Sequence, residues 1–270
     1  MRIAIYQPRY FPQLHYFNRA LTSDVFVLLD SAQYTKSLVH SINGKNIRYK
    51  SYQADTPIKS PDGVHLLTIP LKDHMLPLSE TKIEYSSPWP RKHIATIKSF
   101  YGGSPYGDQI VENIRALLSE RYDSLGALNS KTFLWGITKI LGGEIPVEKM
   151  TIETVNRHLA RSSFKLKRIV TVSDVGVERP SGIHKGTEWT IRICKALGAT
   201  EYLHGRTAQF GYMDESQYKK NGISLLTQDW QRPSYRQKYT EKSPFISNLS
   251  IIDLLCNVHT EEARRVVYPE

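Results

Sequence analysis

Proton-transfer side chains stand at the ends of several short apolar runs in this sequence. Asp30 directly follows the run Asp24 to Leu29, and His204 follows Glu201 to Leu203. The carboxyl ends of parallel strands meet at one edge of a sheet, where ligands bind. There an imidazole can take a proton from a nucleophile, and a carboxylate can orient that imidazole. We therefore predict His204, or His93 at the start of a helix, as the base, with Asp30 as the orienting group.

Two of these side chains have an equally simple structural interpretation. Asp30 is also well placed to cap a turn or a helix. His93 follows Trp89 in a helical pattern, where an exposed histidine is a common case. The residue types alone leave both interpretations open.

The loop Tyr6 to Tyr16, which follows the first apolar run, is stiff and aromatic. Pro8 and Pro12 fix their own φ angles and remove two backbone donors. We predict that this loop forms one wall of a ligand site, with Gln7 and Tyr10 as its contacts. The alternative is a packed aromatic corner in which the rings are simply buried.

Three further loops follow predicted strands and supply the remaining predicted contacts. The loop Ser173 to Glu188 ends at a helix start, where free backbone N–H groups attract phosphate or carboxylate. Lys185 adds a full charge there, although Thr187 has the alternative role of a helix cap. The complete set of predicted substrate contacts is Gln7, Tyr10, Gln33, Lys185, Thr187, Arg206 and Tyr212.

Apolar periodicity predicts the elements that position these loops. A strand at 2–6, a helix at 13–21 and a strand at 24–29 form a βαβ unit, which indicates a parallel sheet. Further helices are expected at 90–101, 108–121, 125–141, 187–197, 214–221 and 251–256, and further strands at 81–85, 168–172, 201–203 and 223–227. Residues 42–52 and 65–71 are expected to pair as an antiparallel hairpin with a long loop. The prediction is one α/β domain over 1–270: a mixed, mainly parallel sheet flanked by helices, with a helical insertion at about 88–150.

The composition of the chain indicates which partners, metals and location to expect. The chain has 270 residues, 40% of them hydrophobic and 23% charged, and its net charge of +10 favours an anionic partner. The basic residues are scattered, which argues against nucleic acid. Cys194 and Cys256 lie in apolar helical patterns and are expected in the core. There is no long apolar run and no metal-ligand spacing among the nine histidines, so we expect a cytoplasmic protein without a membrane span or a metal.

The order of motifs resembles the WbqC-like protein family along nearly the whole chain. Residues 5–17 resemble that family's opening strand and its His-Gln-Pro-x-Tyr-x-Pro-x-x-x-Tyr-Phe loop, with Tyr6 where the family usually has His. The other segments that carry the resemblance are 23–34, 67–70, 89–93, 104–106, 185–188, 197–205, 212–214 and 248–255. Because Tyr6 replaces the histidine, we expect the opening loop to be a binding wall and not the seat of the base.

The resemblance implies a role in surface-polysaccharide and O-antigen (lipopolysaccharide) biosynthesis. The activity it implies is an acyl- or aminoacyltransferase that forms an amide on a nucleotide-linked amino sugar. No cofactor is required by the sequence, and the acyl donor would be carried by an acyl carrier protein, CoA or ATP. Two alternatives stay open: an ATP-dependent amide ligase acting through an acyl-adenylate, and a non-catalytic nucleic-acid-binding protein.

Overall fold

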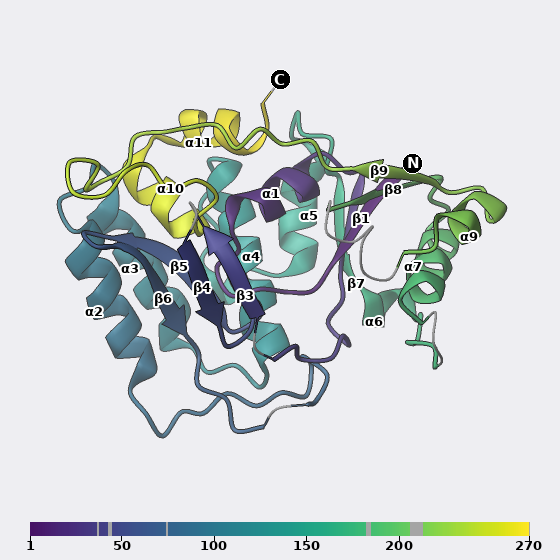
Figure 1. The fold of residues 1–270 in the computed structure, drawn as a ribbon, viewed down its shortest axis with the longest axis horizontal. Coiled ribbons are helices and arrows are strands. Elements are labelled where there is room, and N and C mark those ends of the chain that lie inside the picture. Colours follow the sequence, from purple (N-terminus) through teal and green to yellow (C-terminus); the bar gives the residue numbers. More distant parts are fainter. Residues whose placement is uncertain (37, 43–44, 74, 182–184, 206–212, 270) are drawn as a thin grey trace.

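A sheet of five parallel strands is the centre of the fold (Figure 1). The computed structural model describes residues 1–36, 38–42, 45–73, 75–181, 185–205 and 213–269. The five strands are β1 (Arg2–Tyr6), β2 (Val25–Leu28), β7 (Arg168–Thr171), β8 (Glu201–His204) and β9 (Ser224–Thr227). Their order across the sheet is β7-β2-β1-β8-β9, and every neighbouring pair is parallel. The predicted mainly parallel sheet is confirmed.

The order of the strands creates a switch point beside β1. The chain first moves outward from β1 to β2 and β7, then returns across the sheet to β8 and β9 on the other side. Counted along the chain, these five strands therefore have the order 3-2-1-4-5, which is that of the first strands in dinucleotide-binding folds. Loops leaving β1 and β8 diverge at such a point and leave a crevice at the carboxyl ends of the strands.

Helices cover both faces of the sheet because successive strand residues point to opposite sides. Ile3 belongs to a buried cluster with α7 (Lys185–Ala196) and α9 (Glu215–Lys220). Ala4 belongs to a larger cluster on the other face, with α1 (Leu14–Leu21), α4 (Leu125–Ile140) and α11 (Thr260–Val267). The free cysteines Cys194 and Cys256 are buried, as expected.

The predicted helical insertion is present and leads into further helices. It contains α2 (Trp89–Tyr101), α3 (Gly107–Ser119) and α4, followed by the short η1 (Val147–Lys149) and by α5 (Ile152–Ala160). The remaining helices are α6 (Val172–Val175) and α10 (Ile251–Asn257), and α10 packs against α3. In the part of the chain that the structure describes, no helix is long and apolar enough to cross a membrane.

The antiparallel pairing expected between 42–52 and 65–71 is wrong. Two separate hairpins form instead: β3 (Leu38–Ile42) with β4 (Lys45–Tyr49), and β5 (Asp55–Ser60) with β6 (Gly63–Thr68). Short loops close at a smaller entropy cost than long ones, so each strand pairs with its nearest neighbour in the chain. Gly63, at φ 118°, permits the tight turn between β5 and β6. The strand expected at 81–85 is reduced to a single bridge between Leu71 and Ile83.

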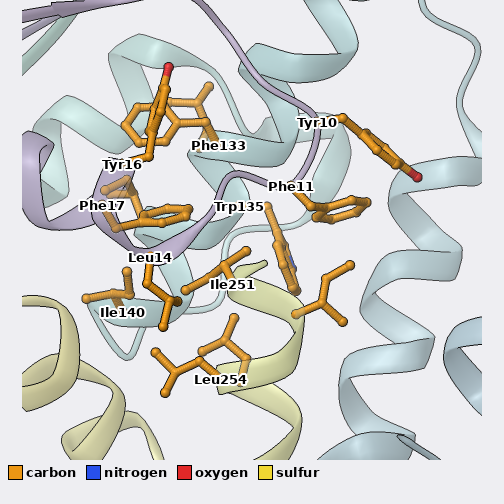
Figure 2. Close-up of a cluster of buried hydrophobic side chains, with 14 of the residues drawn as sticks. Tyr10, Phe11, Leu14, Tyr16, Phe17, Phe133, Trp135, Ile140, Ile251 and Leu254 are labelled. Carbon is orange, nitrogen blue, oxygen red and sulfur yellow. The ribbon is translucent and has the colours of Figure 1, made fainter. Parts of the chain in front are cut away.

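An aromatic cluster joins the opening loop to the helices beneath it (Figure 2). Tyr10, Phe11, Tyr16 and Phe17 are all fully buried. Phe11 meets Trp135 of α4 edge to face, with 5.5 Å between the ring centroids. This geometry adds to the stabilisation that apolar burial alone provides. Much of the loop is therefore core, as the alternative interpretation of its sequence proposed.

Candidate functional site

A cavity of about 400 Å³ lies at the carboxyl ends of β1, β8 and β9, at the switch point of the sheet. The opening segment and α1 form one side, and the segment 228–250, which we call the C-terminal strap, forms the other. Figure 1 shows this strap running from β9 to α10 along one side of the molecule. The lining residues are Tyr6, Arg9, Gln13, His15, Arg19, Tyr52, Gly205, Gln228, Trp230, Gln231, Arg232 and Asn248.

Two guanidinium groups lie against the ring of Tyr6, the last residue of β1. The Cζ atoms of Arg9 and Arg19 lie 4.6 Å and 4.5 Å from its centroid. Arg9 also donates a hydrogen bond of 2.7 Å to the Tyr6 hydroxyl, and its Cζ lies 4.7 Å from the ring centroid of Tyr52. Cation–π contacts of this kind hold a guanidinium group in place without neutralising it. The cavity wall therefore carries two fixed positive charges.

Among the described residues that line the cavity, no carboxylate faces these charges. The lining residues include three arginines, Arg9, Arg19 and Arg232, and no Asp or Glu. None of the three forms an ion pair within the described residues. Arg19 is only 4% exposed; its Nε and Nη2 donate to Oε1 of Gln228, but its Nη1 has no partner. A buried cation with an unsatisfied donor is costly unless another group satisfies it.

Gly205 allows the chain to approach Arg19 closely. It directly follows β8, and a Cβ atom at this position would lie 2.6 Å from Nη2 of Arg19. Real Cβ atoms do not come so close to another heavy atom, so a larger residue would displace the guanidinium group. The glycine after β8 is thus required by the position of the buried arginine.

His15 presents an unprotonated nitrogen to the same cavity. Oδ1 of Asn248 accepts the backbone N–H of His15 at 2.9 Å and lies 3.0 Å from its Nδ1. An atom that accepts from a backbone N–H is an oxygen, so Nδ1 of His15 must carry the proton and donate to it. In the neutral imidazole the lone pair is then on Nε2, to which no described residue donates.

The surroundings of His15 keep the imidazole neutral. Burial, and then the charges of Arg9 and Arg19, lower the pKa of His15 well below its usual value. Asn248 is held in the left-handed region at φ 58°, and its carbonyl accepts a hydrogen bond from Gln13 Nε2 at 2.8 Å. A neutral imidazole with a fixed tautomer is the form that a general base requires.

The same arginines act on Tyr6 in the opposite sense. Burial alone would raise the pKa of Tyr6, but the charges of Arg9 and Arg19 and their hydrogen bonding to the phenol outweigh it and lower the pKa. Because arginine can only donate, the Tyr6 oxygen accepts from Arg9. No described residue accepts the phenol proton in return.

Tyr10, predicted as a substrate contact, and His93, predicted as a base, meet inside the core. The Tyr10 hydroxyl and Nδ1 of His93 lie 3.0 Å apart, and neither residue lines the cavity. His93 is 7% exposed, and burial lowers its pKa to about 4. Gln7 directly follows β1, and its Oε1 accepts from Gln53 Nε2. The contacts of these three side chains help to hold the opening loop in place.

His204 lies next to the cavity without lining it. It ends β8 directly before Gly205, and its Nδ1 donates to the Gly205 carbonyl at 3.0 Å. The side chain is 2% exposed, and its Nε2 has no hydrogen-bond partner. Burial, with a contribution from the nearby Arg19, lowers the pKa of His204. It is thus a second neutral imidazole, but one behind the wall of the cavity.

The other predicted residues are dispersed over the edge of the sheet. Asp30 accepts the backbone N–H of Ser173, at the start of α6, at 3.2 Å. Gln33 donates to the carbonyl of Met75 at 3.1 Å, and Thr187 Oγ1 accepts from the backbone N–H of Asp214 at 3.1 Å. Lys185 is exposed at the start of α7. Arg206 and Tyr212 lie outside the described residues.

The cavity is lined by charged residues of the opening segment that the sequence analysis did not select. Arg9, His15 and Arg19 all lie in or just after the predicted loop, and the spacing of His15 and Arg19 by four residues places them on one face of a helix. This spacing is a sequence signal from which the two residues could be found. The sequence of the strap contains no such signal, because residues 228–250 have neither helical nor alternating periodicity.

The fold and the cavity describe an α/β protein with a cationic site at the switch point of a parallel sheet. The chain belongs to the WbqC-like protein family, which matches residues 7–265. A relative from Mycobacterium tuberculosis (strain ATCC 25618 / H37Rv), named Uncharacterized protein Rv1507c, is 25% identical over 266 residues, covering 96% of this chain and 95% of the relative. No solved structure matches the chain.

Proposed function

We propose that the chain is an acyl- or aminoacyltransferase that forms an amide on a nucleotide-linked amino sugar during surface-polysaccharide (O-antigen) biosynthesis. The observation that carries this proposal is His15, which lines the cavity at the switch point and whose Nδ1 donates to Asn248. Nucleotides bind at such points in parallel sheets. The net charge of +10 suits an anionic substrate and also an acidic carrier protein as acyl donor.

In this proposal His15 is the general base. A new C–N bond forms between the sugar nitrogen and the acyl carbonyl carbon, and the nitrogen must lose a proton as it does so. Nε2 of His15 takes that proton, and the bond from the carbonyl carbon to the donor breaks with its electron pair going to the leaving group.

This assignment replaces the bases that the sequence suggested. His93 is buried in the aromatic core. His204 is also buried and is not among the residues that line the cavity. His15 belongs to the opening segment, in which we had expected no base. We further propose that the reaction takes place in the cytoplasm, where nucleotide-linked sugars are available.

The test is an amide-forming assay with the purified full chain. Uridine- and deoxythymidine-diphosphate amino sugars are supplied with acetyl-CoA, or with glycine and ATP, and products are identified by mass spectrometry. The wild type should add an acyl or glycyl group, and His15→Ala should lose this activity. His158→Ala is the matched control, because His158 is an exposed histidine on α5. If no combination yields an amide, the proposed function fails.

The same assay separates the two alternatives. Release of pyrophosphate on mixing with ATP and an amino acid would identify a ligase that forms an acyl-adenylate. Tight binding to DNA or RNA with a steep salt dependence, and no amide product, would identify a nucleic-acid-binding protein.

A further inference from the structure

We infer that the cavity binds a diphosphate group through Arg9, Arg19 and Arg232. This inference deepens the proposed function, because the diphosphate is the part of a nucleotide-linked sugar that joins the sugar to the nucleoside. It rests on the charge and geometry of the cavity, and it can be tested without any transfer reaction.

The charge of the cavity is the first argument. Three guanidinium groups line one cavity, with no carboxylate among the described lining residues. Arg19 is nine-tenths buried and keeps Nη1 without a protein partner. A planar guanidinium group binds phosphate oxygens through paired N–H donors. An anion with several oxygens and more than one negative charge satisfies all three groups, whereas one carboxylate does not.

The rigidity of the arginines is the second argument. The side-chain amide of Gln228 donates to the His15 carbonyl at 2.8 Å and to Asn18 Oδ1 at 2.6 Å. Its oxygen is thereby directed at Arg19, to which it is bonded through Nε and Nη2. Arg9 is held by the Tyr6 hydroxyl. Side chains fixed before binding lose little entropy when the ligand arrives.

The size of the cavity is the third argument. A volume of about 400 Å³, closed on one side by the strap, suits a small ligand. The switch point lies beyond the carboxyl ends of β1 and β8, where the phosphates of nucleotides bind in related topologies. Gly205 lets the backbone come close to the anion-binding arginine.

Tyr6 offers a spectroscopic reporter inside the cavity. The groups that face it are Arg9 from the loop, Arg19, His15 and Tyr16 from α1, and Tyr52 from the segment after β4. The two arginines favour the phenolate. A bound diphosphate neutralises their charge, so Tyr6 should then lose its proton at a higher pH. Absorbance at 295 nm follows this ionisation, and Tyr6→Phe identifies its contribution.

The experiment measures binding of inorganic pyrophosphate to the full chain by calorimetry at constant ionic strength, with acetate as the comparison anion. We expect pyrophosphate to bind more tightly than acetate, and Arg19→Gln to weaken its binding at least tenfold. The matched control is Arg115→Gln, because Arg115 is an exposed arginine on α3 that should leave binding unchanged. Arg232 lies on the exposed part of the strap, and Arg232→Gln should weaken pyrophosphate binding severalfold. This variant replaces Arg19→Gln in the test if Arg19→Gln does not fold.

Two results would overturn the inference. One is wild-type protein that binds pyrophosphate no better than acetate. The other is an equal loss in Arg115→Gln and the cavity variants, which would mean general attraction to a basic surface. Pyrophosphate should also shift the ionisation of Tyr6 to higher pH, and an unchanged titration counts against the site. If pyrophosphate binds but no amide forms, the proposed function fails while this inference holds.

Discussion

The opening segment of the chain has two sides that differ sharply. Tyr6, Arg9 and His15 line the cavity, whereas Tyr10 and Phe11 are fully buried in the core. Both sides contain an aromatic ring in contact with a histidine: Tyr6 with His15, and Tyr10 with His93. The comparison teaches that the direction of a side chain, and not its type, decides between a chemical and a structural role.

Local backbone geometry produces this separation. Phe11 adopts φ 35°, which turns the chain between the two prolines and directs its ring toward Trp135. In α1 the spacing of Leu14, Phe17 and Leu21 places them on the core face. We call Tyr6, Arg9 and His15 the cavity side and Tyr10 and Phe11 the core side. Substitutions on the two sides should have different effects.

The largest effect is expected on the cavity side. His15→Ala should lower the rate of amide formation by about 10²- to 10⁴-fold, the usual contribution of a general base. Since the pKa of His15 is held well below 6.5, the base is already deprotonated near neutral pH. The wild-type rate should thus stay constant as pH falls through 6.5 and decline only at lower pH. A rate that follows an ordinary histidine pKa would contradict the assignment, and His158→Ala is the control.

The next effect belongs to the core side. Phe11→Ala removes a fully buried ring and should lower the free energy of unfolding by about 3–5 kcal/mol, measured by urea denaturation. Val39→Ala, at a 58% exposed position, should change it by less than about 0.5 kcal/mol. Loss of pyrophosphate binding in a still-folded Phe11→Ala would show that the two sides are not separate.

A smaller effect concerns the buried His93. Its pKa is about 4 in the folded chain and 6.5 in the unfolded chain, so only the unfolded chain takes up a proton between these values. Lowering the pH from 7 to 4.5 should therefore cost about 2–3 kcal/mol of stability through this residue. The comparison is urea denaturation of wild type and His93→Gln at both pH values. Equal pH dependence in the two proteins would place His93 in contact with water.

The smallest effect should come from Gly205→Ala. The added Cβ atom pushes against Nη2 of Arg19, so pyrophosphate should bind about tenfold more weakly, about 1.4 kcal/mol, with little change in stability. Gly143→Ala is the control, because a Cβ atom there meets only ordinary contacts at 3.8 Å. Unchanged binding in Gly205→Ala would mean that Arg19 can move without loss.

The sequence predicted the main elements well because their signals are local. Buried strands such as β1 and β2 are continuous apolar runs, and α2, α3 and α4 have clear helical spacing. The pairing of the hairpins was missed because pairing depends on which strands meet in space. Pro57, a residue type that usually interrupts strands, lies within β5, a strand that is buried along its whole length.

The predicted ligand site stays a prediction. Residues of the opening loop, among them Tyr6 and Arg9, do line a cavity at the edge of the sheet. The surroundings of Arg19 could not be predicted, since its neighbours Gln228 and Gly205 are about 200 residues away in the chain. The tautomer of His15 likewise depends on Asn248. Such long-range partners leave no local pattern.

A buried polar network holds the strap in place. Lys59 donates to Gln237 Oε1 at 3.2 Å and to the carbonyls of Ser243 and Pro244. Gln237 in turn donates to Asp253 Oδ2 at 2.8 Å, and both Lys59 and Asp253 are fully buried. Breaking one member would leave a buried charge unpaired, so the strap docks as a unit.

The docked strap has a consequence for the order of events during synthesis on the ribosome. The first and last thirds of the chain both line the cavity, from Tyr6 to Asn248. A nascent chain that ends before the strap therefore has no anion site, however well its early helices have formed. Arg19 of α1 acquires its bond to Gln228 only when the strap has left the exit tunnel. Under the proposed function, a nucleotide-linked sugar should therefore stabilise a nascent chain only once it extends through Asn248.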